Sequence, residues 1–459
     1  MSDIYDVIVI GAGAVGENAA DYATRGGLKV VLIENELVGG ECSYWACMPS
    51  KALLRPGAAL RAARSVGGAK QAISPQAKLD ASAVLARRDG ATNHWDDSGQ
   101  VKWVESAGID LIRGRAKITD VRKVVVGETV YTARYAVVAA TGSSAFVPDI
   151  PGLRGAKPWT SREATSAKYV PESLIILGGG VVACEMATAY AELGAKVTMV
   201  VRGKSLLHGQ EDFAGQLVVK SLMNLGVSIL PGTTVSKVER DRDEILVAAG
   251  RTPNTADLGV ELLKLPTRPG GWLDVDDTLL VRTTDWLYAV GDVNGRALLT
   301  HQGKYQARAA GSVIAARALG RNLETTAWGK HMATADISSV PQVTFTDPEV
   351  ASVGIMSHTA SRMGLRTKVV DYNLAWLAGS SVYSDAYEGF ARLVIDAQRD
   401  VIVGATFVGP DVGELVHAAT IAVVGEVQIA RLWHAVPSYP TVSEIWLRLL
   451  DKYLSEKDR

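Results

Sequence analysis

Two glycine-rich turns, each set between an apolar strand and a helix, predict an α/β fold with two Rossmann-like domains. The turns read GAGAVG at residues 11–16 and GGGVVA at residues 178–183. A third observation is the alternation of strands and helices after residue 336, which predicts a C-terminal α+β region. With 459 residues, the chain is long enough for about three domains.

The first turn has the complete sequence context of a dinucleotide site. The segment DVIVI at 6–10 predicts a strand, 17–25 a helix and 29–33 a second strand. Gly11 permits a tight turn, Gly13 admits a pyrophosphate, and Gly16 allows close packing of helix on strand. Glu34, at the end of the second strand, is the expected partner of a ribose hydroxyl.

The second turn differs at the position of that acid. Gly178 and Gly180 are retained, and a helix from about 184 to 193 lies between predicted strands 174–177 and 196–201. No carboxylate follows; Arg202 and Lys204 stand there instead, which suits a ribose 2′-phosphate. The alternative is that both are solvated residues at a strand end. Two unlike sites predict two dinucleotides, FAD held permanently and NADPH (or NADH) exchanging.

Cys42 and Cys47 form a close pair after a flexible Gly39-Gly40 entry, and Pro49 indicates the first turns of a helix. Zinc would need about four ligands, and neither Cys184 nor the seven histidines complete such a set, so we expect no metal. Two buried, unreactive cysteines are a second alternative. A redox-active disulfide reduced by a flavin accounts better for the setting, because a helix N-terminus stabilises the thiolate needed for exchange.

The segment GGECSYWACMPSK resembles the redox motif of the pyridine nucleotide–disulfide oxidoreductases, the family of dihydrolipoamide dehydrogenase, glutathione reductase and mercuric reductase. The resemblance extends over nearly the whole chain. Four further segments carry it: AATGS at 139–143 with Thr141 and Gly142, VAAGRTPNT at 247–255 with Gly250 and Arg251, LYAVGDVNG at 287–295 with Gly291 and Asp292, and VTFTDPEVASVG at 343–354.

The resemblance implies a role for each residue of the redox motif. Cys42 would be the interchange thiol that meets the substrate, and Cys47 the charge-transfer thiol against the flavin. Lys51 would lie near the flavin N5 and pair with Glu185, since a cation stabilises reduced flavin and a buried lysine needs a carboxylate. Without the resemblance, Lys51 would be taken for a surface helix residue. Gly40 and Asp292 are further expected FAD contacts, Asp292 at the ribityl chain.

The resemblance also implies the domain organisation. Residues 1–150 would form the first part of an FAD-binding domain and 274–335 its second part. Residues 151–273 would form the NAD(P)H-binding domain and 336–459 an α+β dimerisation domain. A homodimer is expected, because the C-terminal segment should face the disulfide of the other subunit.

The chain departs from the family at the C-terminal acid–base residue. Pro440-Thr441 and Glu444 match the family pattern, but Tyr439 stands where a catalytic His is usual. A tyrosine with a pKa of about 10 is a weak base at neutral pH. Tyr439 could act as an acid, fill a dimer interface, or line a pocket whose substrate needs no base. Mercuric reductases have a similar Tyr but also a C-terminal cysteine pair, absent after Cys184 here, which disfavours that activity.

A second departure is a shortening around Asp241–Asp243. The family has additional strands between Val235 and Val247, and this chain has too few residues for them. Either the protein lacks these strands, or a stretch of chain is missing from the sequence.

Composition excludes several classes of partner. Lys and Arg total 48 against 49 Asp and Glu, which gives no reason to expect nucleic acid or a membrane. Three cysteines and no apparent targeting segment indicate a cytoplasmic protein.

The leading hypothesis is an FAD-dependent NAD(P)H:disulfide oxidoreductase resembling dihydrolipoamide dehydrogenase, with a small-molecule disulfide as acceptor. One alternative is a quinone or metal-ion reductase acting from the flavin. Another is a flavin-dependent dithiol oxidase. A flavin-binding scaffold or NAD(P)H sensor is disfavoured, because it would not need both cysteines together with Lys51 and Glu185.

Overall fold

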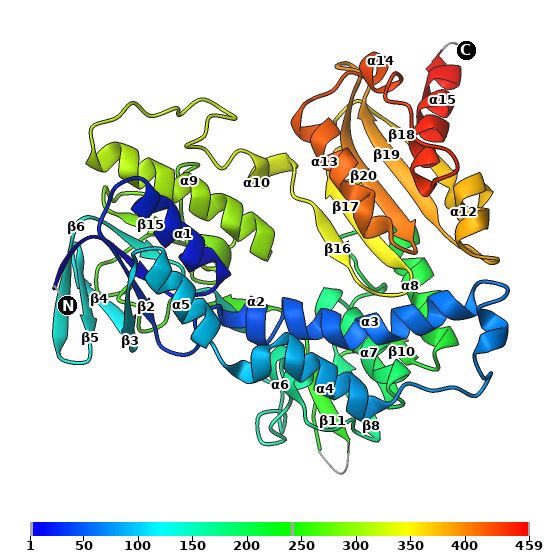
Figure 1. Cartoon of the computed structure of the whole chain (residues 1–459), viewed down its shortest axis with the longest axis horizontal. Coiled ribbons are helices and arrows are strands. Elements are labelled where there is room, and N and C mark those ends of the chain that lie inside the picture. Colours follow the sequence, from blue (N-terminus) through cyan, green and yellow to red (C-terminus); the bar gives the residue numbers. More distant parts are fainter. Residues whose placement is uncertain (1–2, 240–242, 458–459) are drawn as a thin grey trace. The chain divides into compact units, whose positions relative to one another are not determined.

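A computed structural model describes residues 3–239 and 243–457. The chain folds into two compact units, each assembled from three segments (Figure 1). Unit 1 contains 1–49, 89–146 and 250–337, and unit 2 contains 50–88, 147–249 and 338–459.

Unit 1 is built on a seven-stranded sheet. Six of its strands follow the order β3-β2-β1-β6-β5-β4, and the seventh, β15, also pairs with β6. Strands β3, β2, β1 and β15 run parallel to β6, whereas β5 and β4 form an antiparallel extension. The strands are β1 (Ile4–Ile10), β2 (Val30–Glu34), β3 (Asp110–Arg113), β4 (Ala116–Asp120), β5 (Lys123–Val126), β6 (Thr129–Ala139) and β15 (Leu287–Ala289). Two small antiparallel pairs complete the unit, β7 (Ser143–Ala145) with β12 (Arg251–Pro253) and β13 (Thr267–Arg268) with β14 (Trp272–Leu273).

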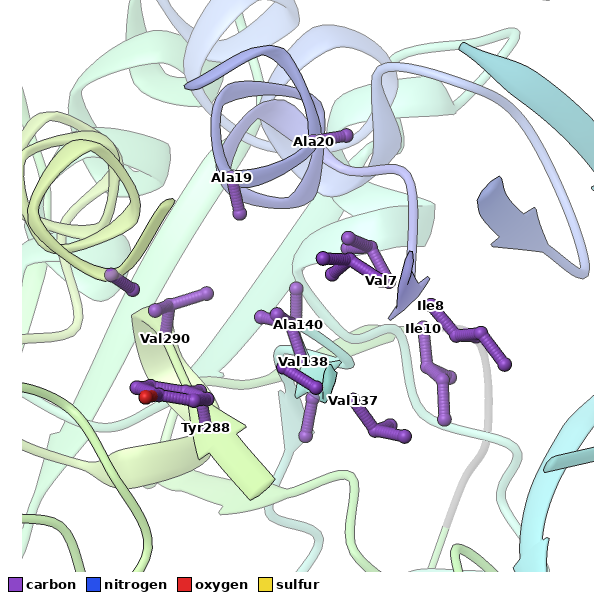
Figure 2. Close-up of a cluster of buried hydrophobic side chains, with 14 of the residues drawn as sticks. Val7, Ile8, Ile10, Ala19, Ala20, Val137, Val138, Ala140, Tyr288 and Val290 are labelled. Atoms are coloured by element: carbon purple, nitrogen blue, oxygen red, sulfur yellow. The ribbon is translucent and has the colours of Figure 1, made fainter. Parts of the chain in front are cut away.

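Helices α1 (Ala14–Arg25) and α9 (Thr300–Ala318) lie side by side against this sheet (Figure 1). Figure 2 shows side chains of β1, β6 and β15 gathered beneath Ala19 and Ala20 of α1. Small residues let the two helices approach closely: a methyl group at Gly311 would lie 2.7 Å from Cβ of Tyr22. Helices α2 (Gly40–Tyr44) and α5 (Ser98–Ser106) also belong to this unit.

Unit 2 has a four-stranded parallel sheet in the order β10-β9-β8-β11. Its members are β8 (Ser173–Leu177), β9 (Lys196–Val201), β10 (Ser228–Pro231) and β11 (Glu244–Val247). Its associated helices are α4 (Ala81–Ala91), α6 (Ser161–Ser166), α7 (Val181–Glu192) and α8 (Asp212–Asn224). Helix α3 (Cys47–Arg64) begins in unit 1 and continues into unit 2.

The C-terminal part of unit 2 is a five-stranded antiparallel sheet in the order β16-β17-β20-β19-β18. The strands are β16 (Gln342–Thr344), β17 (Glu349–Gly354), β18 (Thr367–Asn373), β19 (Phe390–Asp396) and β20 (Val401–Gly409). The short helix α10 (Ala335–Ser338) lies at the end of the last segment of unit 1. The helices of the C-terminal region are α11 (Ser357–Arg362), α12 (Ala378–Tyr383), α13 (Val416–Val424), α14 (Ile429–Leu432) and α15 (Ile445–Lys457).

The predicted fold class is confirmed: the chain has two Rossmann-like parallel sheets and a C-terminal α+β region. The four-part domain division stays a prediction. The shortening at Asp241 lies outside the described residues; in the described residues on either side, no strand lies between β10 and β11. No helix in the described part of the chain is long and apolar enough to cross a membrane.

Candidate active site

The first glycine-rich turn connects β1 to α1 in unit 1. Gly11 has φ +99°, and a Cβ there would lie 2.4 Å from the carbonyl oxygen of Ala140. A Cβ at Gly16 would lie 1.8 Å from the carbonyl oxygen of Gly11, so both positions exclude a side chain. Gly13 is the N-cap of α1 and no side chain caps the helix. The uncapped N-terminus of α1 fits a bound pyrophosphate, so the turn suits FAD.

Glu34 is buried at the end of β2 and is fixed by backbone amides. Its Oε2 accepts a 2.6 Å hydrogen bond from the amide of Ala12, and its Oε1 accepts a 2.8 Å bond from the amide of Glu36. Burial raises the pKa of Glu34, and these amide bonds oppose the rise. The backbone amides therefore fix the orientation of the carboxylate, and its contact with a ribose stays a prediction.

The redox loop packs directly on this turn. The amide of Gly39 donates a 2.7 Å hydrogen bond to the carbonyl of Ala12. A Cβ at Gly40, where φ is +58°, would lie only 2.7 Å from Cα of Gly13. The two glycine segments therefore place the cysteine pair beside the expected pyrophosphate position.

Cys42 and Cys47 are half-buried thiols that hydrogen-bond to each other. Cys42 lies in α2 and Cys47 is the first residue of α3, where the helix dipole favours a thiolate. The hydroxyl of Thr300, the first residue of α9, lies 3.3 Å from Sγ of Cys47 and also hydrogen-bonds Cys42. One hydroxyl thus contacts both thiols.

The protonation of Cys42 is set by opposing influences. Its hydrogen bond with Cys47, burial and the charge of Cys47 raise the pKa of Cys42. The hydroxyl of Thr300 and the positive charge of Lys304 lower it. The influences that raise the pKa of Cys42 outweigh those that lower it, so the surroundings favour the protonated thiol at Cys42.

The third part of the site in unit 1 is a polar network around Asp292. The hydroxyl of Ser143 donates a 2.6 Å bond to Oδ2 of Asp292, and Arg251 donates to both the hydroxyl and the carbonyl of Ser143. Arg251 also lies 3.6 Å from Oδ2 of Asp292. The segments predicted from LYAVGDVNG and VAAGRTPNT therefore meet, and together they fix Asp292.

Neighbouring backbone segments hold the same network in place. Thr141 donates a 2.8 Å bond to the carbonyl of Asn254, and the amide of Asn254 donates a 3.0 Å bond to the carbonyl of Gly142. Gly291, with φ +76°, donates its amide to Oε1 of Gln306 at 2.8 Å. Gln306 thus ties the loop of Asp292 to α9.

In unit 2, Lys51 of α3 and Glu185 of α7 form an ion pair. Nζ of Lys51 lies 2.8 Å from Oε2 and 3.1 Å from Oε1 of Glu185. The amide of Phe345 donates a 3.0 Å bond to the same carboxylate, whose side chain is 4% exposed. The side chain of Lys51 is 37% exposed, so solvent partly screens this ion pair, and the two hydrogen bonds to Glu185 set the orientation of Lys51.

The second glycine-rich turn connects β8 to α7. Gly178 has φ +143°, and a Cβ there would lie 2.3 Å from the carbonyl oxygen of Ala248. Gly180 is the N-cap of α7, no side chain caps it, and a Cβ there would meet open space. The turn has the features that a second dinucleotide pyrophosphate requires.

Arg202 and Lys204 are exposed immediately after β9, whose last residue, Val201, is buried. The structure therefore leaves the end of this strand with two cations and no carboxylate. The geometry is compatible with a 2′-phosphate, and the preference for NADPH stays a prediction.

Tyr439 and Glu444 differ in how much of their side chains is exposed. Tyr439 is 75% exposed in the single chain, whereas Glu444 is 4% exposed. Oε1 of Glu444 accepts two hydrogen bonds from Arg448, at 3.0 and 2.5 Å, and Oε2 is buried without a hydrogen-bond partner among the described residues. Glu444 therefore forms an ion pair with Arg448 through Oε1, and its Oε2 has no hydrogen bond among the described residues.

Several residues of the site were not predicted. Thr300, Lys304 and Gln306 lie on α9, far along the chain from the cysteines and Asp292, and Ser143 was not singled out. One local feature could have indicated α9: Thr300 and His301 follow the predicted flavin segment by a few residues, and α9 begins at Thr300. The described residues contain no group of three or more His, Cys, Asp and Glu side chains that could hold a metal ion.

Comparisons with known proteins agree with this geometry. The family model described as "Pyridine nucleotide-disulphide oxidoreductase" matches residues 5–311, and the model of the dimerisation domain of that family matches residues 340–449. The sequence is similar to a mercuric reductase of Staphylococcus aureus, with 30% identity over 96% of this chain and 81% of that protein. It is also similar to a dihydrolipoyl dehydrogenase of Haloferax volcanii, with 31% identity over 98% of this chain and 96% of that protein.

The fold is similar to that of the HOCl-induced flavoprotein disulfide reductase RclA from Escherichia coli. The TM-score is 0.82 over 97% of this chain and 99% of that chain, with 24% identity. Proteins of the matched family depend on FAD and use NAD(P)H, and the residues described above fit both cofactors. The chain therefore belongs to the pyridine nucleotide–disulphide oxidoreductase family, and is an FAD-dependent oxidoreductase that acts on a disulfide.

Proposed function

We propose that the protein is an NADPH-preferring disulfide reductase, similar to dihydrolipoamide dehydrogenase, that works as a homodimer on a small-molecule disulfide. The observation that carries the proposal is the pair of hydrogen-bonded thiols, Cys42 and Cys47, against the hydroxyl of Thr300. An unreactive buried pair would not need a shared hydroxyl or the two helix N-termini of α3 and α9.

The bond changes of the acceptor half-reaction balance on the two cysteines. The Cys42 thiolate attacks one sulfur of the acceptor, which gives a mixed disulfide and a leaving thiolate. The Cys47 thiolate then attacks Sγ of Cys42, releases the second thiolate and closes the Cys42–Cys47 disulfide. The two leaving groups take up two protons. FAD, when bound, supplies the two-electron relay from the nicotinamide that restores the dithiol.

Residues of both units contribute to cofactor binding in this proposal. Gly11, Gly13, Gly16, Glu34 and Asp292 hold FAD, whereas Gly178, Gly180, Arg202 and Lys204 hold NADPH. Glu185 orients Lys51, to which the family resemblance assigns the stabilisation of the reduced flavin.

The test is steady-state turnover with NADPH across lipoamide, glutathione disulfide, a mycothiol-type disulfide, quinones and metal ions. We expect one disulfide to be reduced, and Cys42→Ser or Cys47→Ser to lower that rate at least about a thousandfold. Cys184→Ala is the matched control, since Cys184 is buried in α7, and it should leave the rate unchanged. Anaerobic reduction should give a long-wavelength charge-transfer band that Cys47→Ser removes.

Tyr439 supports a second candidate, a quinone or metal-ion reductase that acts from the flavin. A tyrosine in place of the usual histidine weakens proton transfer to a leaving thiolate but does not affect electron transfer to a quinone. If acceptor reduction survives both cysteine substitutions, this second function is correct and the disulfide reductase proposal is wrong. Oxidation of a dithiol with net reduction of NADP⁺ would indicate the reverse reaction, a dithiol oxidase.

A further inference from the structure

Lys51 of α3 has a second contact in unit 2 besides its ion pair. Its Nζ donates hydrogen bonds to both carboxylate oxygens of Glu185, at 2.8 and 3.1 Å. The same atom lies over the ring of Phe345, 4.7 Å from the ring centre. A cation within about 6 Å of an aromatic centroid is attracted to the face of the ring. A carboxylate and an aromatic ring therefore hold the ammonium group together.

Phe345 contacts both members of this ion pair. Its ring lies against Lys51, and its backbone amide donates a 3.0 Å hydrogen bond to Oε1 of Glu185. The amide bond exists whichever side chain stands at 345, whereas the contact with Lys51 needs the ring. Substitution of the side chain therefore tests the ring contact alone.

The connection between β16 and β17, which carries Phe345, is also fastened to α3 at a second point. Oδ2 of Asp347 lies 3.0 Å from Nε of Arg61, which is farther along the same helix. Within the connection, the hydroxyl of Thr346 donates a 2.7 Å hydrogen bond to the carbonyl of Pro348. These contacts hold the connection against α3, so the ring of Phe345 keeps its place over Lys51.

Lys51 requires such a restraint because its side chain is 37% exposed. A lysine side chain has a flexible four-carbon stem, and water screens the charge of an exposed ammonium group. A ring over the ammonium group limits both its movement and its contact with water. A charge that is partly covered in this way acts more strongly on a neighbouring charge, because the effective dielectric constant is lower.

We propose that the ring of Phe345 positions Lys51 and shields its charge, and thereby makes reduction of the bound flavin more favourable. Phe345 acts through Lys51 and is a positioning residue. This inference rests on the proposed function, in which Lys51 stabilises the reduced flavin. The resemblance of residues 343–354 to a dimerisation domain assigns Phe345 no such role.

The experiment measures the midpoint potential of FAD in the purified holoenzyme by anaerobic titration against a reference dye. All variants also carry Cys42→Ser and Cys47→Ser, so that electrons enter only the flavin. We expect Phe345→Leu to lower the equilibrium constant for flavin reduction about two- to fivefold, as expected for loss of a cation–π contact at a partly exposed site. Phe345→Tyr keeps the ring and should keep the potential of the parent chain.

A double-mutant cycle with Lys51→Met distinguishes positioning of the lysine from a general effect on the fold. If the ring acts through Lys51, Phe345→Leu should have no further effect once Lys51 is replaced. The same shift with and without Lys51 would overturn the proposal. If Lys51→Met does not retain FAD, Lys51→Gln takes its place in the cycle.

Phe213→Leu is the matched control, because the ring of Phe213 also has a cation over it. That cation is Arg392, 5.2 Å from the ring centre, and not Lys51. The midpoint potential should therefore equal that of the parent chain. A shift as large as that of Phe345→Leu would show that the effect does not depend on Lys51 and would overturn the proposal.

Two outcomes distinguish this inference from the function on which it rests. If the wild-type enzyme reduces no disulfide with NADPH, the proposed disulfide reductase function is wrong; the midpoint potential is measured without any such acceptor. If disulfide turnover is present, but Phe345→Leu leaves the midpoint potential unchanged, only the role of Phe345 is wrong.

Discussion

The two glycine-rich turns share one backbone requirement and differ in what surrounds it. At Gly11 and at Gly178, an added Cβ would lie 2.4 and 2.3 Å from a carbonyl oxygen of the neighbouring strand connection. Both residues also have positive φ, at +99° and +143°. The first glycine of each turn is therefore dictated by backbone packing, whichever dinucleotide binds.

The third position separates the two turns. A Cβ at Gly16 would lie 1.8 Å from the carbonyl oxygen of Gly11, whereas the second turn carries the buried Ala183 at the same place. Helix α1 therefore sits closer to its turn than α7 does. Alanine can therefore occupy the third glycine position only where the helix leaves space for a methyl group.

The strand after each turn ends differently. Glu34 is buried and bonded to two backbone amides, whereas Val201 is followed by the exposed Arg202. A carboxylate suits a free ribose hydroxyl and a cation suits a phosphate. The backbone thus makes both turns alike, and the residue at the strand end distinguishes their ligands.

The largest effect is expected from Gly16→Ala, because the new methyl group would collide with fixed backbone. Purified protein should contain little or no FAD by absorbance, and expression should be poor. Gly180→Ala is a control in the second turn, where a Cβ meets open space; FAD content should be normal. The position equivalent to Gly16 in that turn is already alanine, at Ala183. Normal FAD content in Gly16→Ala would mean that α1 can shift, and the contrast between the turns would be lost.

Tyr439→His should affect only the acceptor half of the reaction. An imidazole exchanges protons at neutral pH, whereas a phenol does so poorly. We expect lipoamide turnover to rise about ten- to a hundredfold, with flavin reduction by NADPH unchanged in stopped-flow measurements. Wild-type lipoamide turnover already as fast as flavin reduction would show that Tyr439 is no handicap.

Arg202→Glu should affect only the half-reaction in which NAD(P)H reduces the flavin. Loss of a charge-assisted phosphate contact costs about 1.5–3 kcal/mol, or roughly ten- to a hundredfold in affinity. The ratio of kcat/KM for NADPH over NADH should fall by that factor or invert, while Glu34 and FAD content are unaffected. Equal kcat/KM for the two nucleotides in the wild type would contradict the assignment of Arg202.

The smallest effect is expected from Ala183→Gly, which gives the second turn the third glycine of the first. Glycine in a helix interior costs about 1 kcal/mol relative to alanine, so the free energy of unfolding measured with urea should fall by that amount. NADPH binding should change little. A loss of several kcal/mol would contradict this estimate and show that the cavity left by the buried Ala183 methyl group outweighs the effect of helix propensity.

Much of the fold follows from local patterns. The apolar run at 7–10 is buried throughout in β1, as expected of a parallel strand covered on both faces. The strand at 196–201 alternates between more and less buried residues, which also indicates a strand. Each glycine turn then begins a helix, α1 at Ala14 and α7 at Val181, earlier than the predicted 17 and 184. The boundary was late because the turn glycines conceal the helix start.

Contacts between distant segments could not be predicted in this way. The ion pair of Lys51 with Glu185, at 2.8 Å, was expected only from the family resemblance. Nothing in the local sequence of either residue indicates the other. Thr300 contacts the thiols from the start of α9, and nothing in its local sequence links it to residue 47. Helical and strand periods describe which face is buried, and they carry no information about what covers that face.

The sequence by itself determined the two dinucleotide turns, the cysteine pair, the strand-end residues that distinguish the turns and the substitution of Tyr439. Each of these depends on a residue type that one backbone geometry or one chemistry requires locally. Only the tertiary structure decided that Ser143 and Arg251 fix Asp292, and that the hydroxyl of Thr300 lies 3.3 Å from Sγ of Cys47. These groups come from strands and helices far apart in the chain, and they meet because folding must give each polar group that leaves water a hydrogen-bond partner.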